Sequence, residues 1–248
     1  MTAMTQPARS VATKILSALA TVLDPELDEP VTELGFVRSV TIDDEGVEVH
    51  LRLPTSFCAP NFAYLMVADA YDALAEVPEI GRVRVLLDDH HDSDKINNGT
   101  AAGLGYVGTF GVEAEDSLDE LRRTFQRKAH VAAMERCCRS VLASGAWTLE
   151  ELPLLELFDL PEGPLKSALL RRRGAVGLPN HAHARVMVEP DGSPVAKSDV
   201  ALWLRLAATT RVSIEGNAHF CRGLLATRYA DTDPAGAVPV ITDARSHS

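Results

Sequence analysis

The chain has 248 residues, of which 46% are hydrophobic and 24% are charged, and its formal net charge at pH 7 is -11. This length leaves room for two domains with cores of their own. The negative charge argues against a dedicated nucleic-acid-binding protein, because phosphate backbones are held by clustered Lys and Arg. No apolar run approaches the roughly 20 residues that a membrane-spanning helix needs, so we expect no membrane segment.

The four cysteines add a constraint on the cellular compartment. They are Cys58, Cys137, Cys138 and Cys221, and their spacing is irregular. No secretory signal precedes them, so we expect reduced thiols in the cytoplasm instead of a disulfide framework. Cys137 and Cys138 fall on different faces of a predicted helix and do not resemble a pair of metal ligands.

The first 90 residues alternate between helical and strand patterns. Apolar residues at helical spacing predict a helix that ends near Leu23. Alternating apolar and polar residues predict two strands, over 36–42 and 47–53, that the turn sequence DDEG joins into an antiparallel hairpin. A second apolar stripe predicts a helix that starts at Pro60, and RVRVLL predicts a third strand over 82–87.

This order of elements predicts the fold class α+β, with a small two-layer αββαβ domain over residues 10–90 followed by a mainly helical second domain with one β-hairpin. Residues 91–115 are rich in Gly, Asn and Asp without a period, which predicts a linker or loop. The helical domain is expected over 116–235 and begins with the capping box SLDE, Ser117–Glu120. Residues 236–248 are expected to form a flexible tail.

The second domain carries several further patterns. RVMVEPDGSPVAK predicts the hairpin through its Pro-Asp-Gly turn. SDVALWLRLAATT and GNAHFCRGLLATRY predict two closing helices.

Cys58 stands in the stretch LPTSFCAP, between the second strand and the helix that starts at Pro60. A residue just before a helix lies beside the unpaired backbone N–H groups and the positive end of the helix dipole, which favours a thiolate. A thiolate is both a nucleophile and a soft metal ligand suited to iron, zinc or iron-sulfur clusters. The alternative is that Cys58 is a small apolar filler at a strand end.

The sequence also contains an ordered set of landmarks. VLDPELDEPVTELGFVRSVTI is followed by VEVHLRLPTSFCAP, by an apolar helix and by IGRVRVLL. As a set, over about residues 10–90, they resemble the metal-sulfur (iron-sulfur) cluster assembly family that includes PaaD-like and SufT-like proteins. The C-terminal domain resembles no family that we identify.

The resemblance implies a compact αββαβ domain that works in the maturation of iron-sulfur or related metal cofactors, with Cys58 as its functional residue. Asp24 and Glu26 match the family's acidic loop, and Thr55 matches its threonine before the cysteine. From the residues alone, the acidic loop fits a solvated helix end slightly better than a metal-ligand or client-contact role. Thr55 either caps the next helix or orients the thiolate.

We therefore expect a cytoplasmic accessory protein, not an enzyme, that binds an iron-sulfur cluster or iron transiently through Cys58 and delivers it to a client metalloenzyme. By analogy with the family, an iron-dependent oxygenase is one such client, and other cluster-assembly proteins are further partners. A cluster ordinarily takes four ligands, so a second copy of the chain in a homodimer, small thiols or the client would complete the coordination. The alternatives are a metal-free adaptor for a metalloenzyme complex and, more weakly, a cysteine-dependent enzyme.

Two other stretches hold metal-ligand residue types. DDHHDSD contains the adjacent His90 and His91, whose side chains would point apart on an extended backbone, so the sequence favours a solvated loop.

NHAH supplies His181 and His183, and AHFC supplies His219 and Cys221. These four residues would form a second metal site if their two segments meet in the fold. Nothing in the spacing brings the segments together.

Overall fold

The computed structural model describes residues 6–111, 118–230 and 239–245. The chain divides into two compact units, Met1–Leu118 with Asn217–Ser248 and Asp119–Gly216, and the boundary falls inside the helix α7 (Val200–Arg228). The first unit therefore takes in C-terminal residues that the sequence assigned to the second domain. Ser117, where the predicted capping box begins, lies outside the described residues.

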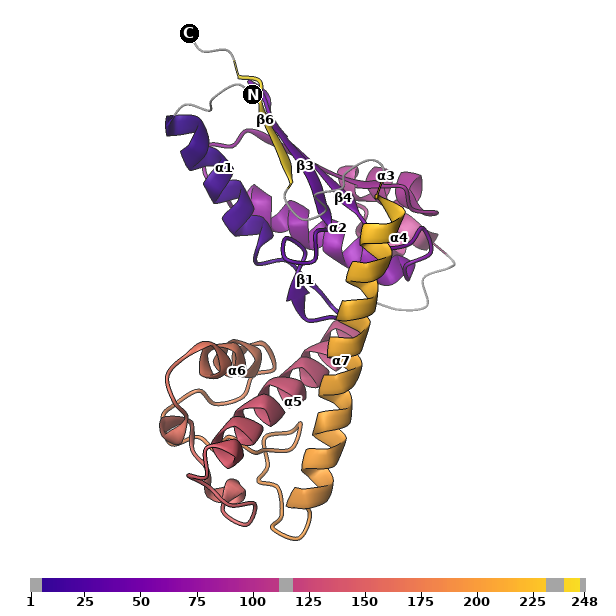
Figure 1. Ribbon diagram of the computed structural model, residues 1–248. Coiled ribbons are helices and arrows are strands. Elements are labelled where there is room, and N and C mark those ends of the chain that lie inside the picture. Colours follow the sequence, from indigo (N-terminus) through magenta and orange to yellow (C-terminus); the bar gives the residue numbers. More distant parts are fainter. Residues whose placement is uncertain (1–5, 112–117, 231–238, 246–248) are drawn as a thin grey trace. The chain divides into compact units, whose positions relative to one another are not determined.

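The first unit is a two-layer α/β assembly (Figure 1). Its sheet has the strand order β5-β4-β3-β6, and β1 and β2 form a separate two-stranded ladder. The elements are α1 (Gln6–Leu19), β1 (Leu23–Asp24), β2 (Glu29–Pro30), β3 (Val37–Ile42), β4 (Gly46–Arg52), α2 (Pro60–Ala75), β5 (Arg82–Asp88), α3 (Ser93–Ala101), α4 (Gly105–Phe110) and β6 (Val240–Asp243). This arrangement confirms the predicted α+β class and the αββαβ order of the first domain.

The β3–β4 hairpin forms where the alternation predicts it. Val40 pairs with Val49, and both are almost completely buried. Asp43 Oδ1 accepts hydrogen bonds from the backbone N–H groups of Glu45 and Gly46, which fixes the turn. A Cβ at Gly46 would lie 2.0 Å from the carbonyl oxygen of Arg82, so the close approach of β4 to β5 requires glycine there.

Helix α2 connects β4 to β5, which run parallel to each other. Pro60 occupies the first turn of α2, as the sequence predicts. The helix buries one face, which includes Val67, Ala70 and Leu74, in the core that it shares with α1 and the sheet.

Two segments of the first unit differ from expectation. Residues 91–115, predicted as linker or loop, contain α3 and α4, because Ile96 and Phe110 are buried in the core and hold these short helices against it. Val240–Asp243, in the predicted flexible tail, forms β6, which pairs in parallel with β3. The pairing covers a strand edge that would otherwise expose unpaired backbone groups.

The second unit is mainly helical and has a separate core. Its elements are α5 (Asp119–Ala143), the short 3-10 turns η2 (Leu152–Leu154) and η3 (Leu157–Asp159), α6 (Pro164–Ala175) and the first part of α7. In place of the predicted hairpin there is a tight turn with one isolated bridge, Val188 to Pro194. The two predicted closing helices are one continuous helix, α7.

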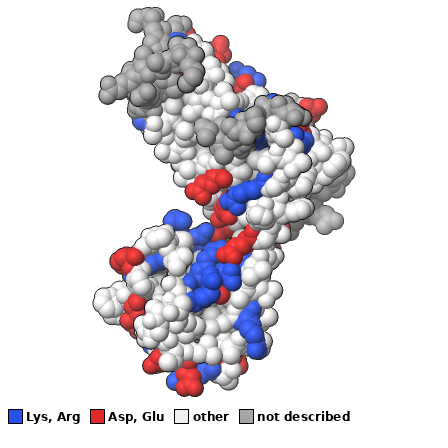
Figure 2. Space-filling view, viewed as in Figure 1, with Lys and Arg blue, Asp and Glu red and all other residues white. Residues whose placement is uncertain are grey.

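Acidic and basic side chains lie close together on the second unit (Figure 2). Arg136 Nε donates to Glu215 Oε1 at 3.1 Å, and Arg211 Nε donates to Glu135 Oε2 at 2.6 Å. These ion pairs join α5 to α7 within the unit. Within the described residues, no helix combines the length and apolar character needed to cross a lipid bilayer.

Candidate functional site

Cys58 lies at the junction of β4 and α2. Ala59 is the N-cap residue of α2 and has no side chain that could cap the helix, and Pro60 follows in the first turn. Cys58 therefore precedes the positive end of the helix dipole by one residue. The residue is half-buried and packs against the core of the first unit.

Thr55 contacts the sulfur directly. The distance between Thr55 Oγ1 and Cys58 Sγ is 3.5 Å, and the same oxygen accepts a hydrogen bond from the Phe57 N–H at 3.2 Å. Because the hydroxyl oxygen already has a donor, its own hydrogen is free to point at the sulfur. A hydrogen bond donated to a thiolate stabilises the ionised form. Thr55 thus contacts the cysteine sulfur and does not cap α2.

We expect Thr55→Val to slow the alkylation of Cys58 by iodoacetamide by roughly threefold at neutral pH, because the thiolate loses its donor. Thr55→Ser keeps the hydroxyl and serves as the matched control. Peptide mass spectrometry after timed labelling measures the rate at Cys58 alone. Simple loosening of the loop would make the valine variant faster, so a faster or unchanged rate would contradict the assigned hydrogen bond.

His90 supports the backbone of the cysteine loop. Its Nε2 lies 2.8 Å from the carbonyl oxygen of Cys58, and its Nδ1 accepts a hydrogen bond from the Asp92 N–H at 3.1 Å. The second bond requires an unprotonated Nδ1, so Nε2 carries the hydrogen that is donated to Cys58. The side chain is buried. The expected solvated loop is therefore wrong at this residue, because two hydrogen bonds make its burial favourable.

The acidic loop lies in the same unit. Asp24 is buried, and its Oδ1 accepts hydrogen bonds from the backbone N–H groups of Glu26 and Leu27, each at 2.9 Å. Burial raises the pKa of Asp24 to about 6, and the nearby carboxylates of Glu26 and Glu29 add to this effect, while the two backbone hydrogen bonds oppose it. Asp24 is therefore not a solvated helix end; it organises the loop and carries an unfavourable buried charge.

Helix α7 brings Cys221 to this region. Cys221 is half-buried against the same core as Cys58. The helix is held on the acidic loop by the Asn217 side chain, whose Nδ2 donates to Glu26 Oε1 at 3.2 Å, and by an ion pair between Arg222 and Glu29. The sequence analysis above named Cys221 as a candidate metal ligand, but it grouped this residue with His181, His183 and His219 and not with the acidic loop.

The other residues predicted for a second metal site do not gather. His181 and His183 belong to the second unit and are exposed, and His183 Nδ1 lies 2.9 Å from Glu156 Oε2. His219 belongs to the first unit and is also exposed. In the part of the chain that the structure describes, no three His, Cys, Asp or Glu side chains form a group that could hold a metal ion.

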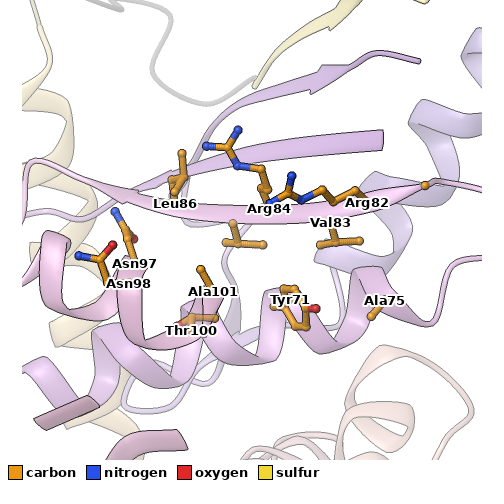
Figure 3. A pocket seen from close by; sticks show the side chains of 12 residues that line it. Tyr71, Ala75, Arg82, Val83, Arg84, Leu86, Asn97, Asn98, Thr100 and Ala101 are labelled. Atoms are coloured by element: carbon orange, nitrogen blue, oxygen red, sulfur yellow. The ribbon is translucent and has the colours of Figure 1, made fainter. Parts of the chain in front are cut away.

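A pocket lies between β5 and the helices α2 and α3 (Figure 3). Figure 3 shows Arg82 and Arg84 directed away from it, across β5, while Tyr71 and Thr100 border it. The residues that line this pocket include no Cys, His, Asp or Glu. It therefore offers no ligands for a soft metal and is not part of the Cys58 site.

Comparisons with known proteins agree with this geometry. The family model described as iron-sulfur cluster assembly protein matches residues 12–87, which include Cys58, Asp24 and Thr55. No solved structure matches the chain.

Curated relatives match about a third of the chain. The iron-sulfur cluster carrier protein of Mycobacterium leprae is 34% identical over 89 residues, which are 36% of this chain and 23% of the relative. The Fe-S protein maturation auxiliary factor YitW of Bacillus subtilis is 29% identical over 93 residues, 37% of this chain and 90% of that factor. An uncharacterized protein of Methanocaldococcus jannaschii is 31% identical over 84 residues, 34% of this chain and 86% of the relative.

The chain spans less than a quarter of the length of the carrier protein that it matches. The two shorter relatives are instead covered over most of their length, 86% and 90%. Through residues 12–87, this chain belongs to the iron-sulfur cluster assembly protein family.

Proposed function

We propose that this chain is an accessory protein that binds an iron-sulfur cluster or iron transiently through Cys58 and delivers it to a client metalloenzyme. The observation that carries the proposal is the half-buried Cys58 sulfur before α2, within 3.5 Å of the Thr55 hydroxyl and in the region that matches the family model. His90 fixes the backbone of Cys58 through its carbonyl oxygen, which supports a defined position for this residue.

The ligand count favours transfer over permanent storage. A [2Fe–2S] or [4Fe–4S] cluster ordinarily takes four thiolates, and the group around Cys58 offers too few. Small thiols, a second copy of the chain or the client would supply the rest. Open coordination positions allow a client thiolate to displace one ligand at a time, which is what delivery requires.

The second unit is proposed to recognise the client. It has its own core, and the family match ends at residue 87, before this unit begins. An iron-dependent oxygenase is the client class that we expect. The protein as a whole would act as a carrier whose product is a loaded client, not a converted small molecule.

Anaerobic reconstitution of the full chain with iron and sulfide tests the proposal. We expect the wild type to retain both elements and to transfer them to an apo-ferredoxin, and Cys58→Ser to lose nearly all of both activities, because serine is a poor ligand for iron-sulfur clusters. Cys137→Ser, the same change at a buried thiol of the second unit, is the matched control and should behave as the wild type.

Two outcomes would overturn the carrier role. Retention of cluster by Cys58→Ser at the wild-type level would show that the cluster is held elsewhere. A wild type that binds neither iron nor sulfide, while still raising the metal occupancy of a co-expressed client, would favour the metal-free adaptor.

A further inference from the structure

The cysteine loop, residues 53–59 between β4 and α2, is bonded to the segment 89–92 that follows β5. His90 Nε2 donates to the carbonyl oxygen of Cys58 at 2.8 Å. The next backbone N–H of the segment donates to the carbonyl oxygen of Ser56 at 2.9 Å. The shape of the cysteine loop therefore depends on the shape of the segment 89–92.

This segment begins with a backbone conformation that few residues adopt. Asp89 has a φ of 53°, in the left-handed region. Aspartate tolerates this region better than most residues do, but the conformation still persists only where surrounding contacts hold it. Because Asp89 directly precedes His90, its conformation sets the direction from which His90 reaches Cys58. Contacts that hold Asp89 thus act on the cysteine loop.

The end of α7 supplies such contacts. Arg228, the last residue of α7, donates through Nη2 to the carbonyl oxygen of Asp89. Through Nη1 it donates to the carbonyl oxygen of Leu53, the first residue of the cysteine loop, at 3.0 Å. The Tyr229 hydroxyl donates to Asp89 Oδ2 at 3.2 Å. One guanidinium therefore joins the two segments, and the next residue holds Asp89 a second time.

The surroundings of Tyr229 keep both side chains in place. Tyr229 is buried, and two guanidinium groups lie over its ring, those of Arg52 at 4.8 Å and Arg228 at 5.2 Å from the ring centroid. A guanidinium presents several N–H donors in one rigid plane, which suits it to bridge two carbonyl oxygens. The ammonium group of a lysine is a single donor centre on a flexible stem and would hold this bridge less well.

We propose that Arg228 and Tyr229 are positioning residues for Cys58. By holding Asp89 in its left-handed conformation, they keep His90 on the Cys58 carbonyl oxygen and the cysteine loop in one shape. A loop that is ordered beforehand loses little conformational freedom when a metal centre binds, so binding is tighter. The inference rests on the proposed carrier role of Cys58 and deepens it, because both positioning residues lie beyond the end of the family match.

Amide hydrogen exchange of the full chain, resolved by NMR, tests the positioning without a metal. Arg228→Gln removes the guanidinium that joins the two segments. The His91 N–H, which bonds to Ser56, and the Asp92 N–H, which bonds to His90, should then exchange roughly tenfold faster than in the wild type.

Three further variants grade and control this effect. Arg228→Lys keeps the charge and one donor centre, so it should recover part of the protection. Tyr229→Phe removes only the hydroxyl and keeps the buried ring, so it should give a smaller increase in exchange in a chain that folds normally. Arg222→Gln makes the same change on the same helix but breaks the ion pair with Glu29, so both N–H groups should exchange at the wild-type rate.

Nitrogen NMR of histidine-labelled protein adds a signature that a general loss of stability would not produce. In the wild type, the two hydrogen bonds of His90 require one neutral tautomer, with its hydrogen on Nε2. In folded Arg228→Gln the ring should lose these partners and show an average of both tautomers.

Cys58 itself provides the functional measurements. At alkaline pH, where the thiol is ionised, iodoacetamide should alkylate Cys58 about threefold faster in Arg228→Gln, because a loosened loop gives easier access to the sulfur. After anaerobic reconstitution, this variant should retain less than about half of the iron and sulfide of the wild type. Arg228→Lys should lie between the two in both measurements.

The outcomes separate this inference from the proposed function. Unchanged exchange of the His91 and Asp92 N–H groups in Arg228→Gln would overturn the positioning role. If that variant has a loosened loop but retains wild-type iron and sulfide, while Cys58→Ser loses both, the positioning role is wrong and the carrier role stands. If the wild type retains neither element, while Arg228→Gln still speeds exchange and alkylation, the positioning of Cys58 stands and the carrier role is wrong.

Discussion

Asp24→Asn is expected to raise the free energy of unfolding of the first unit by about 2 to 3 kcal/mol at pH 7. Asp24 is 7% exposed, and burial raises its pKa from 3.8 to about 6. At pH 7 the folded protein therefore holds a buried carboxylate. Asparagine keeps the oxygen that accepts hydrogen bonds from Glu26 and Leu27 and removes the charge.

The sign of the pH dependence follows from the raised pKa. Between pH 3.8 and about 6 the folded state binds the proton of Asp24 more tightly than the unfolded state. The stability that protonation contributes is complete below pH 3.8 and is lost as the pH rises through about 6. The advantage of Asp24→Asn over the wild type should thus shrink to about 1 kcal/mol at pH 4.5.

Chemical denaturation of the two proteins at pH 7 and pH 4.5 measures this difference. Glu33→Gln is the control for charge, because Glu33 is an exposed carboxylate of the same unit and its removal should change the stability little. A destabilised Asp24→Asn would mean that the carboxylate makes a favourable contact that outweighs its burial.

The buried charge of Asp24 lowers the stability of the fold, which suggests that the charge serves a function. Residues that lower stability persist at sites where their charge has a use. The charge of Asp24 acts on Cys221, whose pKa it helps to raise. Removing it should make the Cys221 thiol easier to ionise.

The elements around Cys58 were predictable because their signals are local. Strand alternation sets the β3–β4 hairpin, and a proline sets the start of α2, each within a few residues. Together they place Cys58 between a strand and a helix. The ordered landmarks then identify the family.

The partners of Cys58 were not predictable, because they depend on contacts between distant segments. DDHHDSD looks solvated by composition, and only the tertiary fold shows that His90 bonds to the carbonyl oxygen of Cys58. Cys221 packs against the core of the first unit, although the whole second unit separates it from that core in sequence. The spacing of Ala218 and Leu225 around it was a signal that its face is buried, but that spacing cannot identify the surface that covers it.

Helix α7 shows that tertiary contacts also limit the prediction of secondary structure from local sequence. The sequence patterns predicted two helices, the second of which starts at Gly216, and glycine inside a helix costs about 1 kcal/mol relative to alanine. The helix continues because Ile214 and Ala218, on either side of the glycine, are both buried. Packing thus outweighs the local preference.

His130→Leu is expected to remove most of a stability loss of about 2 kcal/mol that the second unit suffers between pH 7 and pH 5. His130 lies on α5, is 1% exposed, and its Nε2 has no hydrogen-bond partner among the described residues. Burial lowers its pKa from 6.5 to about 4, and the charge of the buried Arg173 adds to the shift. Leucine removes the unpaired nitrogen and can fill a similar space.

The sign here is opposite to that of Asp24. Between about pH 4 and 6.5 the unfolded chain binds a proton at His130 that the folded chain rejects, so this contribution to stability is present above pH 6.5 and is lost as the pH falls toward 4. Thermal unfolding of the wild type, His130→Leu and His181→Gln across this range measures it, with the exposed His181 as the control for loss of an imidazole. Equal slopes for the wild type and His130→Leu would show that another group drives the acid sensitivity. A flattened slope in His130→Leu alone would place the acid sensitivity at this buried ring, where burial and the nearby Arg173 guanidinium hold the pKa of the folded imidazole to about 4.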